Sequence, residues 1–186
     1  VFHPGQISGV FSLELQKEYA TEPALYFSDD WRITDVLTAT YGLRYSTFFN
    51  VGARDIQNYS NPNNPTDLES TGLTAYGPGE IIASFTGLAG LEPRLALNYQ
   101  VGPKASLKAS YNRSRQYLHL ISNNTTATPV NIWRPAGKFI APATVDQVAL
   151  GWAQNYGESG VRLGIEVYYK EFQDLLDYKD GADLIF

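Results

Sequence analysis

The chain has 186 residues and a formal net charge of −5, from 14 basic and 19 acidic side chains, and the basic residues form no stripe of the kind that nucleic-acid binding needs. Hydrophobic residues make up 44% of the chain, yet no apolar run approaches the roughly 20 residues of a transmembrane helix. Because these residues include no cysteine, a disulfide framework and a thiolate metal site are both excluded within them.

The first predicted element is a hairpin over residues 24 to 47, in which apolar and polar side chains alternate. A period of two indicates strands with one apolar and one polar face. The apolar positions flank a short turn at residues 34 to 36 and are Leu25, Phe27, Trp31, Ile33, Leu37, Ala39, Tyr41, Leu43 and Tyr45. Asp29 is the exception on this face, and we expect a β-bulge or a neighbouring partner to accommodate its carboxylate.

Two further hairpins are predicted over residues 93 to 113 and 147 to 172, with turns at residues 102 to 104 and 155 to 160. Neither contains an apolar stripe repeating every three or four residues, which excludes an amphipathic helix. The apolar positions are Leu95, Leu97, Tyr99, Val101, Leu107, Ala109, Tyr111, Val148, Leu150, Trp152, Val161, Leu163, Ile165, Val167 and Tyr169. Weaker strand signals around residues 11 to 15 and at the end of the chain would raise the count from six strands to eight.

The connections between these hairpins are much longer than the turns within them. Residues 48 to 91 and 114 to 145 are rich in Asn, Pro, Thr and Gly and are expected to be long extracellular loops. Compact soluble domains seldom contain such long connections without regular structure. Short turns at one rim and long loops at the other are typical of outer-membrane β-barrels.

Aromatic residues on the apolar faces favour the same fold. Trp31, Tyr99 and Trp152 each lie three residues before a short turn, which predicts one aromatic girdle at that membrane interface. Tyr45 and Tyr169 lie further along the strands that follow and are expected at the opposite interface, where a phenol keeps its hydroxyl in water.

The predicted fold class is therefore all-β, an antiparallel transmembrane β-barrel in the bacterial outer membrane. Two alternatives stay open: a soluble carbohydrate-binding β-sandwich, and a small closed outer-membrane barrel of eight strands that serves in adhesion or binding. In the sandwich, Leu43, Leu97 and Val167 would be packed inside a water-soluble body. The exposure of these three residues separates the sandwich from the barrel.

Three segments resemble strands of TonB-dependent receptors. They are "YATEPALYFSDDWRITDVLTATYGLRYS", "EPRLALNYQVGPKASLKASYNRSRQYLHLISN" and "VDQVALGWAQNYGESGVRLGIEVYYKEF". Each motif alone is weakly specific, but the three occur in order with matching turns across nearly all of residues 19 to 182. The chain is similar to those receptors of this family that carry a carboxypeptidase-regulatory-like N-terminal domain.

This resemblance implies a 22-stranded barrel, with a plug domain in its lumen, to which the chain contributes six to eight strands. It also implies active uptake of a nutrient, such as a glycan, a peptide or a metal chelate, driven by TonB. No plug domain is expected in this sequence, and TonB would be contacted through an N-terminal part of the parent receptor. The implied partners are outer-membrane lipid, the rest of the barrel and its plug, TonB and, as a further candidate, a surface lipoprotein.

Charged residues on the polar strand faces are expected to face the lumen, where they line a substrate path, contact the plug or are merely solvated. These lumen candidates are Arg44, Arg94, Lys108, Arg162, Glu166 and Lys170. Aromatic, amide and basic groups in the long connections are candidates for ligand contact, although loops are generally rich in such residues. These loop candidates are Tyr117, His119, Asn123, Asn124, Trp133, Arg134, Tyr59 and Tyr76.

No catalytic or metal site is predicted. The sequence has no cysteine, no Gly-x-Ser-x-Gly elbow and no Walker-type loop, and the adjacent Asp29 and Asp30 point to opposite faces of a strand. His3 and His119 have no second histidine at metal-ligand spacing. An aspartate recurs every third residue from Asp174, but without the spacing or the terminal glutamate of an EF-hand. We therefore expect neither an enzyme nor a cofactor.

Overall fold

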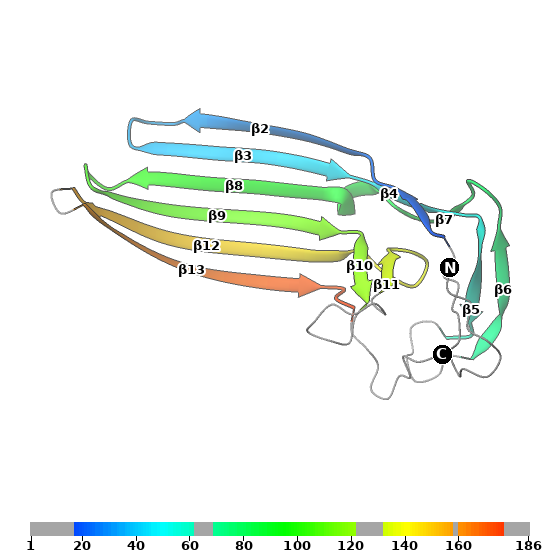
Figure 1. The fold of residues 1–186 in the computed structure, drawn as a ribbon. Helices are drawn as coiled ribbons and strands as arrows, with labels where there is room; N and C mark the ends of the chain where they lie inside the picture. Colours follow the sequence, from blue (N-terminus) through cyan, green and yellow to red (C-terminus); the bar gives the residue numbers. More distant parts are fainter. Residues whose placement is uncertain (1–16, 62–68, 122–131, 158–159, 177–186) are drawn as a thin grey trace, which may run out of the picture.

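The computed structural model describes residues 17–61, 69–121, 132–157 and 160–176, and almost all of their regular structure is β (Figure 1). The helical element within these ranges is the short 3-10 helix η1 (Gly87–Gly90), and no helix there is long and apolar enough to cross a membrane. The strands are β1 (Tyr19–Thr21), β2 (Ala24–Arg32), β3 (Leu37–Ser46), β4 (Phe48–Val51), β5 (Arg54–Tyr59), β6 (Ser70–Tyr76), β7 (Ile81–Phe85), β8 (Leu91–Gln100), β9 (Ala105–Gln116), β10 (Leu118–Ile121), β11 (Ile132–Pro135), β12 (Ala143–Tyr156) and β13 (Val161–Gln173).

The six long strands form one antiparallel sheet in the order β13-β12-β9-β8-β3-β2. The shortest of them has 9 residues and the longest has 14, whereas a tilted transmembrane strand needs about 9–11. The three predicted hairpins are all present, and β9 and β12 extend beyond their expected ends to Gln116 and back to Ala143. Each of the six is therefore long enough to cross a membrane.

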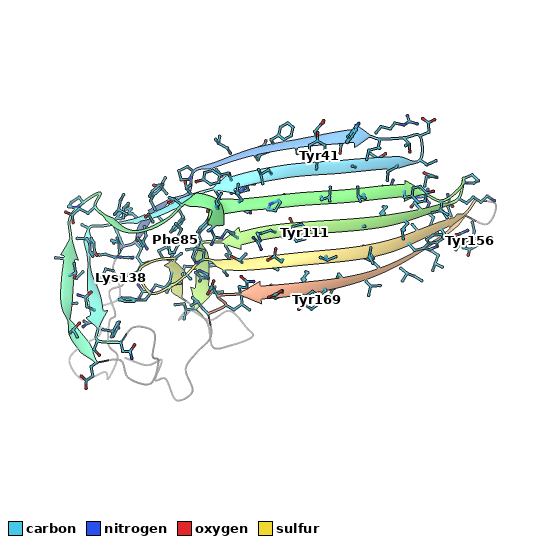
Figure 2. All side chains as sticks on the ribbon, turned by 180° about the vertical axis from the view of Figure 1, so that it is seen from behind. Tyr41, Phe85, Tyr111, Lys138, Tyr156 and Tyr169 are labelled. Carbon is cyan, nitrogen blue, oxygen red and sulfur yellow. The ribbon has the colours of Figure 1, made fainter. Side chains whose placement is uncertain are left out.

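The strand register aligns the apolar residues of neighbouring strands. Tyr41 pairs with Leu95, Leu95 with Tyr111, Tyr111 with Val148, and Val148 with Tyr169. Side chains of directly paired residues lie on the same face of a sheet, so these five residues form one row across five strands; Figure 2 labels the three tyrosines. The predicted alternation thus produces an apolar face across five strands, which the charged residues Arg113, Asp146 and Glu171 interrupt near the Gln116 end of β9.

That apolar face is uncovered. Leu43 is 44% exposed, Leu97 36% and Val167 69%, and no second layer of described residues packs against either face of the long sheet (Figures 1 and 2). A soluble β-sandwich would bury these three residues. The structure therefore contradicts the sandwich and confirms the all-β, partial-barrel architecture.

The long connections contain strands, contrary to the expectation that they lack regular structure. They contribute β4 and β7 to a three-stranded sheet in the order β1-β4-β7 and form the two-stranded sheets β5-β6 and β10-β11. We call the described residues within 17–23, 47–90 and 117–142, which include these strands and η1, the cap; it lies at the end of the long sheet opposite the short turns (Figure 1). The cap contains the small hydrophobic core of the described residues, where Phe48, Tyr117 and Ala136 are buried against Phe85.

The short turns at the other end of the sheet are closed by local hydrogen bonds. The backbone N–H groups of Ile33 and Thr34 both donate to the Leu37 carbonyl, at 3.0 and 3.1 Å, and the Leu37 N–H donates to the Thr34 hydroxyl at 3.0 Å. In the second turn Gly102 adopts a φ of 77°, a conformation that glycine reaches without steric cost. Both turns lie where the sequence predicts them.

Candidate functional site

The six lumen candidates all lie on the polar face of the long sheet, opposite Leu97. Lys108 pairs with Gly151 and Gly151 with Glu166, and Arg94 begins a row that runs through Asn112 and Gln147 to Lys170. The complete set is Arg44, Arg94, Lys108, Arg162, Glu166 and Lys170. The alternation read from the sequence therefore brings these charges to one surface, whereas their contact with a plug or a substrate stays a prediction.

A shallow concavity of about 340 Å³ lies in the middle of this polar face. Its lining consists mainly of short side chains, including Thr40, Ala96, Ser110, Ala149 and Gly151. Lys108 and Glu166 also line it, and each has Gly151 as its pair partner on β12. The absence of a side chain at Gly151 leaves open space between these opposite charges.

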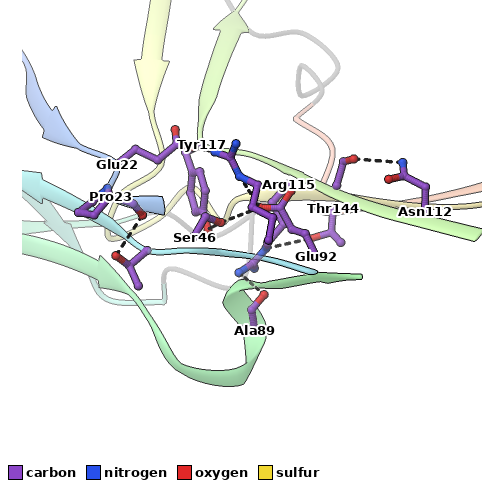
Figure 3. A network of polar contacts seen from close by, with 12 residues as sticks. Glu22, Pro23, Ser46, Ala89, Glu92, Asn112, Arg115, Tyr117 and Thr144 are labelled. Carbon is purple, nitrogen blue, oxygen red and sulfur yellow. Dashed lines mark hydrogen bonds and ion pairs between the residues drawn. The ribbon is translucent and has the colours of Figure 1, made fainter. Parts of the chain in front are cut away.

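A buried polar network joins the long sheet to the cap (Figure 3). The Ser46 hydroxyl donates to the Glu92 carboxylate at 2.7 Å and lies 2.9 Å from the Tyr117 hydroxyl. Arg44 supplies positive charge to the same carboxylate, with 3.4 Å between Nε and Oε1. The Tyr117 ring stacks on Phe48 at a centroid distance of 4.8 Å. Tyr117, which follows β9, thereby contacts both Ser46 at the end of β3 and Phe48 at the start of β4.

Tyr117 and His119 are buried, although the sequence suggests them as loop residues that contact a ligand. Tyr117 is 3% exposed and His119 is 5% exposed, so neither side chain can be reached from outside the cap in this arrangement. The hydroxyl and ring contacts of Tyr117 are packing contacts. The sequence does not reveal this because the partners Ser46 and Phe48 are about 70 residues away.

His119 carries a buried imidazole. Burial lowers its pKa below the ordinary value of 6.5, and a hydrogen bond to the backbone of Ala141 offsets only part of this effect. Its Nε2 atom has no hydrogen-bond partner among the described residues. The neutral form is therefore favoured at pH 7.

The remaining loop candidates are separated in space. Trp133 is 58% exposed on β11, and Tyr76 is half-buried at the end of β6. Tyr59 and Arg134 line the same cavity. Asn123 and Asn124 lie outside the described residues.

The cavity that contains Tyr59 and Arg134, which we call the cap pocket, has a volume of about 320 Å³. The Tyr59 ring meets Phe139 edge-on at 5.4 Å, and the Lys138 ammonium lies 5.5 Å from the centroid of the Phe139 ring. Lys138 also donates to Asn58 Oδ1 at 2.8 Å. Aromatic and cationic groups from β5 and from the β11–β12 connection thus converge on one cavity.

A shared carboxylate forms another part of this pocket. Glu18 Oε1 lies 2.7 Å from Arg54 Nη1 and also pairs with Arg134. The Arg54 Nη2 group donates to Asn50 Oδ1 at 2.9 Å. Sequence reasoning missed Glu18, Arg54, Lys138 and Phe139, because no local pattern links residues separated by up to 116 positions.

The five predicted interface aromatics all lie on the apolar face. Tyr99 and Trp152 are both paired with Leu107, whereas Trp31 is offset by one row, because its partner Ala39 pairs with Leu97. Barrel strands are tilted, so residues of one pairing row do not share one height. Tyr45 and Tyr169 lie closer to the cap, and the position of all five at membrane interfaces stays a prediction.

No group of three or more acidic or histidine side chains in the described ranges is arranged to hold a metal ion. Of the aspartates spaced three apart, only Asp174 falls within those ranges.

Comparison with known families accounts for this architecture. The family model described as TonB dependent receptor-like, beta-barrel matches residues 7–184. No curated protein and no solved structure matches the chain significantly. The family match does not extend to a carboxypeptidase-regulatory-like N-terminal domain, so that subtype stays a prediction. Since the match spans nearly the whole chain and every strand of the long sheet, the chain belongs to the TonB-dependent receptor-like β-barrel family, an outer-membrane transporter family of Gram-negative bacteria.

Proposed function

We propose that the chain forms part of the wall of an outer-membrane receptor that takes up a nutrient with energy relayed by TonB. The observation that carries this proposal is the uncovered apolar face of six strands, opposite a face whose charged residues include the six lumen candidates. In an outer-membrane barrel, the apolar face contacts lipid and the polar face contacts a water-filled lumen. The family match supports the same assignment.

The edges of the long sheet require further strands in such a receptor. β2 and β13 are its outermost members, and each has a neighbour on one side only among the described residues. An unpaired strand edge in hydrocarbon leaves backbone N–H and C=O groups without partners, which is too costly to persist. The rest of the barrel would supply these partners, and the plug and the TonB-contacting segment would belong to the parent receptor.

The cap gives the proposed orientation. Outer-membrane barrels have short periplasmic turns and longer extracellular segments, so the cap would face outward and the turns near residues 34 to 36 and 102 to 104 would face the periplasm. A glycan, a peptide or a metal chelate captured by the cap would then pass the charged polar face. A surface lipoprotein, if one takes part, would contact the same cap.

Cysteine labelling in the parent receptor tests the assignment of the two faces. The chain contains no cysteine, so a cysteine introduced into it is unique within these 186 residues. Leu97 and Asn98 are neighbours on β8 that point to opposite faces. In isolated outer membranes, Leu97→Cys should react with a lipid-soluble maleimide and resist a water-soluble one, and Asn98→Cys should react with the water-soluble reagent.

Two controls accompany this experiment. Lys138→Cys, in the exposed part of the cap, should react with the water-soluble reagent on intact cells if the cap faces outward. Equal reaction of Leu97→Cys and Asn98→Cys with the water-soluble reagent would contradict the barrel. Uptake of the nutrient that persists without TonB would contradict the proposed transport mechanism while leaving the barrel intact.

A further inference from the structure

The cap pocket has features of a ligand site that go beyond the general role proposed above, and an assignment of its ligand rests on that role. Its volume of about 320 Å³ falls at the lower end of the range for small-ligand sites, about 300–1,000 Å³. It is lined by Glu18 just before β1, by β5, by the end of β11 and by the β11–β12 connection. These segments belong to the cap and are not part of the long sheet.

The first observation is that three buried polar atoms, one on Glu18 and two on Arg54, have no hydrogen-bond partner among the described residues. The Arg54 side chain is 8% exposed and the Glu18 side chain 14%, yet Arg54 Nε and Glu18 Oε2 make no hydrogen bond within the described structure. Buried donors and acceptors are nearly always paired. Arg54 Nε is a donor and Glu18 Oε2 is an acceptor, and a ligand hydroxyl group can pair with either atom because it both accepts and donates.

The second observation is the aromatic wall. Phe139 is 41% exposed, and Tyr59, half-buried, meets it edge-on. The C–H face of a sugar ring packs against such rings while its hydroxyls point to polar groups. Gln57 also lines the pocket, and Lys138 donates a hydrogen bond to Asn58.

The third observation is charge. Three cations, Arg54, Arg134 and Lys138, line the pocket with two carboxylates, Glu18 and Asp55, which gives a local charge of 3 − 2 = +1 in a chain of net charge −5. Arg134, which is 39% exposed, shares Glu18 with the more deeply buried Arg54. Arg134 can therefore turn to a ligand carboxylate and open Glu18 to a ligand hydroxyl, while Arg54 keeps Glu18 in position.

We propose that the cap pocket binds a sugar residue of an oligosaccharide that carries a carboxylate. The hydroxyls of the sugar pair with Glu18 and Arg54, its ring packs against Tyr59 and Phe139, and its carboxylate is held by Arg134 and Lys138. An acidic peptide would satisfy the cations but offers no row of hydroxyls, and a neutral sugar would leave the excess positive charge unmatched.

A glycan array with neutral and uronic-acid-bearing oligosaccharides, probed with the detergent-purified parent receptor, tests this assignment. We expect binding to the acidic glycans, competed by free trigalacturonate and not by triglutamate. The double variant Tyr59→Ala, Phe139→Ala should bind about tenfold more weakly, since aromatic contacts of this kind are worth about one factor of ten in affinity. The matched control Trp133→Ala removes an exposed cap aromatic outside the pocket and should bind like wild type.

Variants that remove a positive charge distinguish binding of an acidic glycan from binding of a neutral glycan. Lys138→Ala should weaken binding to acidic glycans and reduce its salt dependence, whereas Lys104→Ala, in a short turn at the far end of the sheet, should leave both unchanged. The proposal is overturned if no glycan binds, if neutral glycans bind as well as acidic ones, or if triglutamate competes equally. If the cysteine pattern on β8 holds while the array fails, only the ligand assignment falls; if the pattern fails, the barrel assignment falls as well.

Discussion

Gly90 shows, at the scale of single residues, how closely the cap approaches the long sheet. A Cβ atom at this position would lie 2.1 Å from the Ser46 carbonyl oxygen, far inside van der Waals contact. We expect Gly90→Ala to destabilise the receptor by about 1–3 kcal/mol, because the backbone must move to admit the methyl group. Heat-modifiable migration in detergent measures the loss. Gly164→Ala is the control, since its Cβ would meet no atom within 4 Å, and an equal loss in both variants would contradict the contact.

His119 makes the stability of the cap depend on pH. Its folded-state pKa lies below the ordinary 6.5, so below that pH the unfolded cap binds a proton that the folded cap does not, and stability falls as the pH drops. We expect cap segments to be cleaved faster by a protease at pH 5.5 than at pH 7.5. The glutamine in the His119→Gln variant does not titrate, so most of the difference in cleavage rate between the two pH values should disappear. If the difference is unchanged in this variant, other groups cause the pH dependence.

Asp29 illustrates what residue-level reasoning can and cannot supply. The alternation identifies it as a polar residue on the apolar face and offers a bulge or a neighbouring partner as the explanation. The structure shows the partner: the Tyr41 hydroxyl donates to Asp29 Oδ2 at 2.9 Å, and the pairing of β2 with β3 runs through Asp29 without a shift. Choosing between the two explanations requires the register, because Tyr41 is adjacent only after the hairpin has formed.

At the scale of elements, β8 provides a matched test of the two faces of the sheet. Leu97→Arg would place a guanidinium on the proposed lipid face, two residues from the predicted interface residue Tyr99, and should cost about 1–2 kcal/mol, between the values for an interface and for the bilayer midplane. Asn98→Arg would place the same group on the charged polar face and should be tolerated. The amount of folded receptor in the outer membrane measures both. Equal yields of the two variants would argue against lipid contact at Leu97.

Tyr117 ties β10 to the long sheet through its ring and its hydroxyl. Tyr117→Phe keeps the stacking on Phe48 and loses the contact with Ser46, so we expect a loss of about 0.5–1.5 kcal/mol. Tyr117→Ala also removes the buried ring, at a cost of about 3–5 kcal/mol. In limited proteolysis, the cap of the Tyr117→Ala variant should therefore be cleaved much faster than the cap of the Tyr117→Phe variant. Leu118→Ala, at a site that is 48% exposed, should have little effect.

The elements predicted from sequence are those whose pattern is local. In the long strands, apolar and polar residues alternate many times, so the sequence shows which residues share a face. Because a short turn joins each of these strands to its partner, the sequence also predicts the hairpins. The cap strands are short, and β1 pairs with β4 across more than 25 residues of chain. Their pairing depends on packing around Phe48 and Tyr117, which no local window contains. For the same reason the sequence suggested Tyr59 and Arg134 separately but not the pocket that they share.

At the scale of the whole molecule, the open sheet makes a prediction about hydrogen exchange. In the parent receptor, the amides of β2 and β13 should be protected as strongly as those of the central β8 and β9, because neighbouring barrel strands pair with them. In the 186-residue chain alone, they should exchange much faster than the central amides. Equal protection in the isolated chain would mean that β2 and β13 have further strand partners within the 186 residues, which would favour the small closed barrel of eight strands.

The short side chains around Gly151 have a consequence for passage through the proposed barrel. Thr40, Ala96, Ser110 and Ala149 pair in turn across four adjacent strands, so only short side chains would project into the proposed lumen along this row. A bulky cargo would therefore gain clearance along this stretch of the sheet, between Lys108 and Glu166.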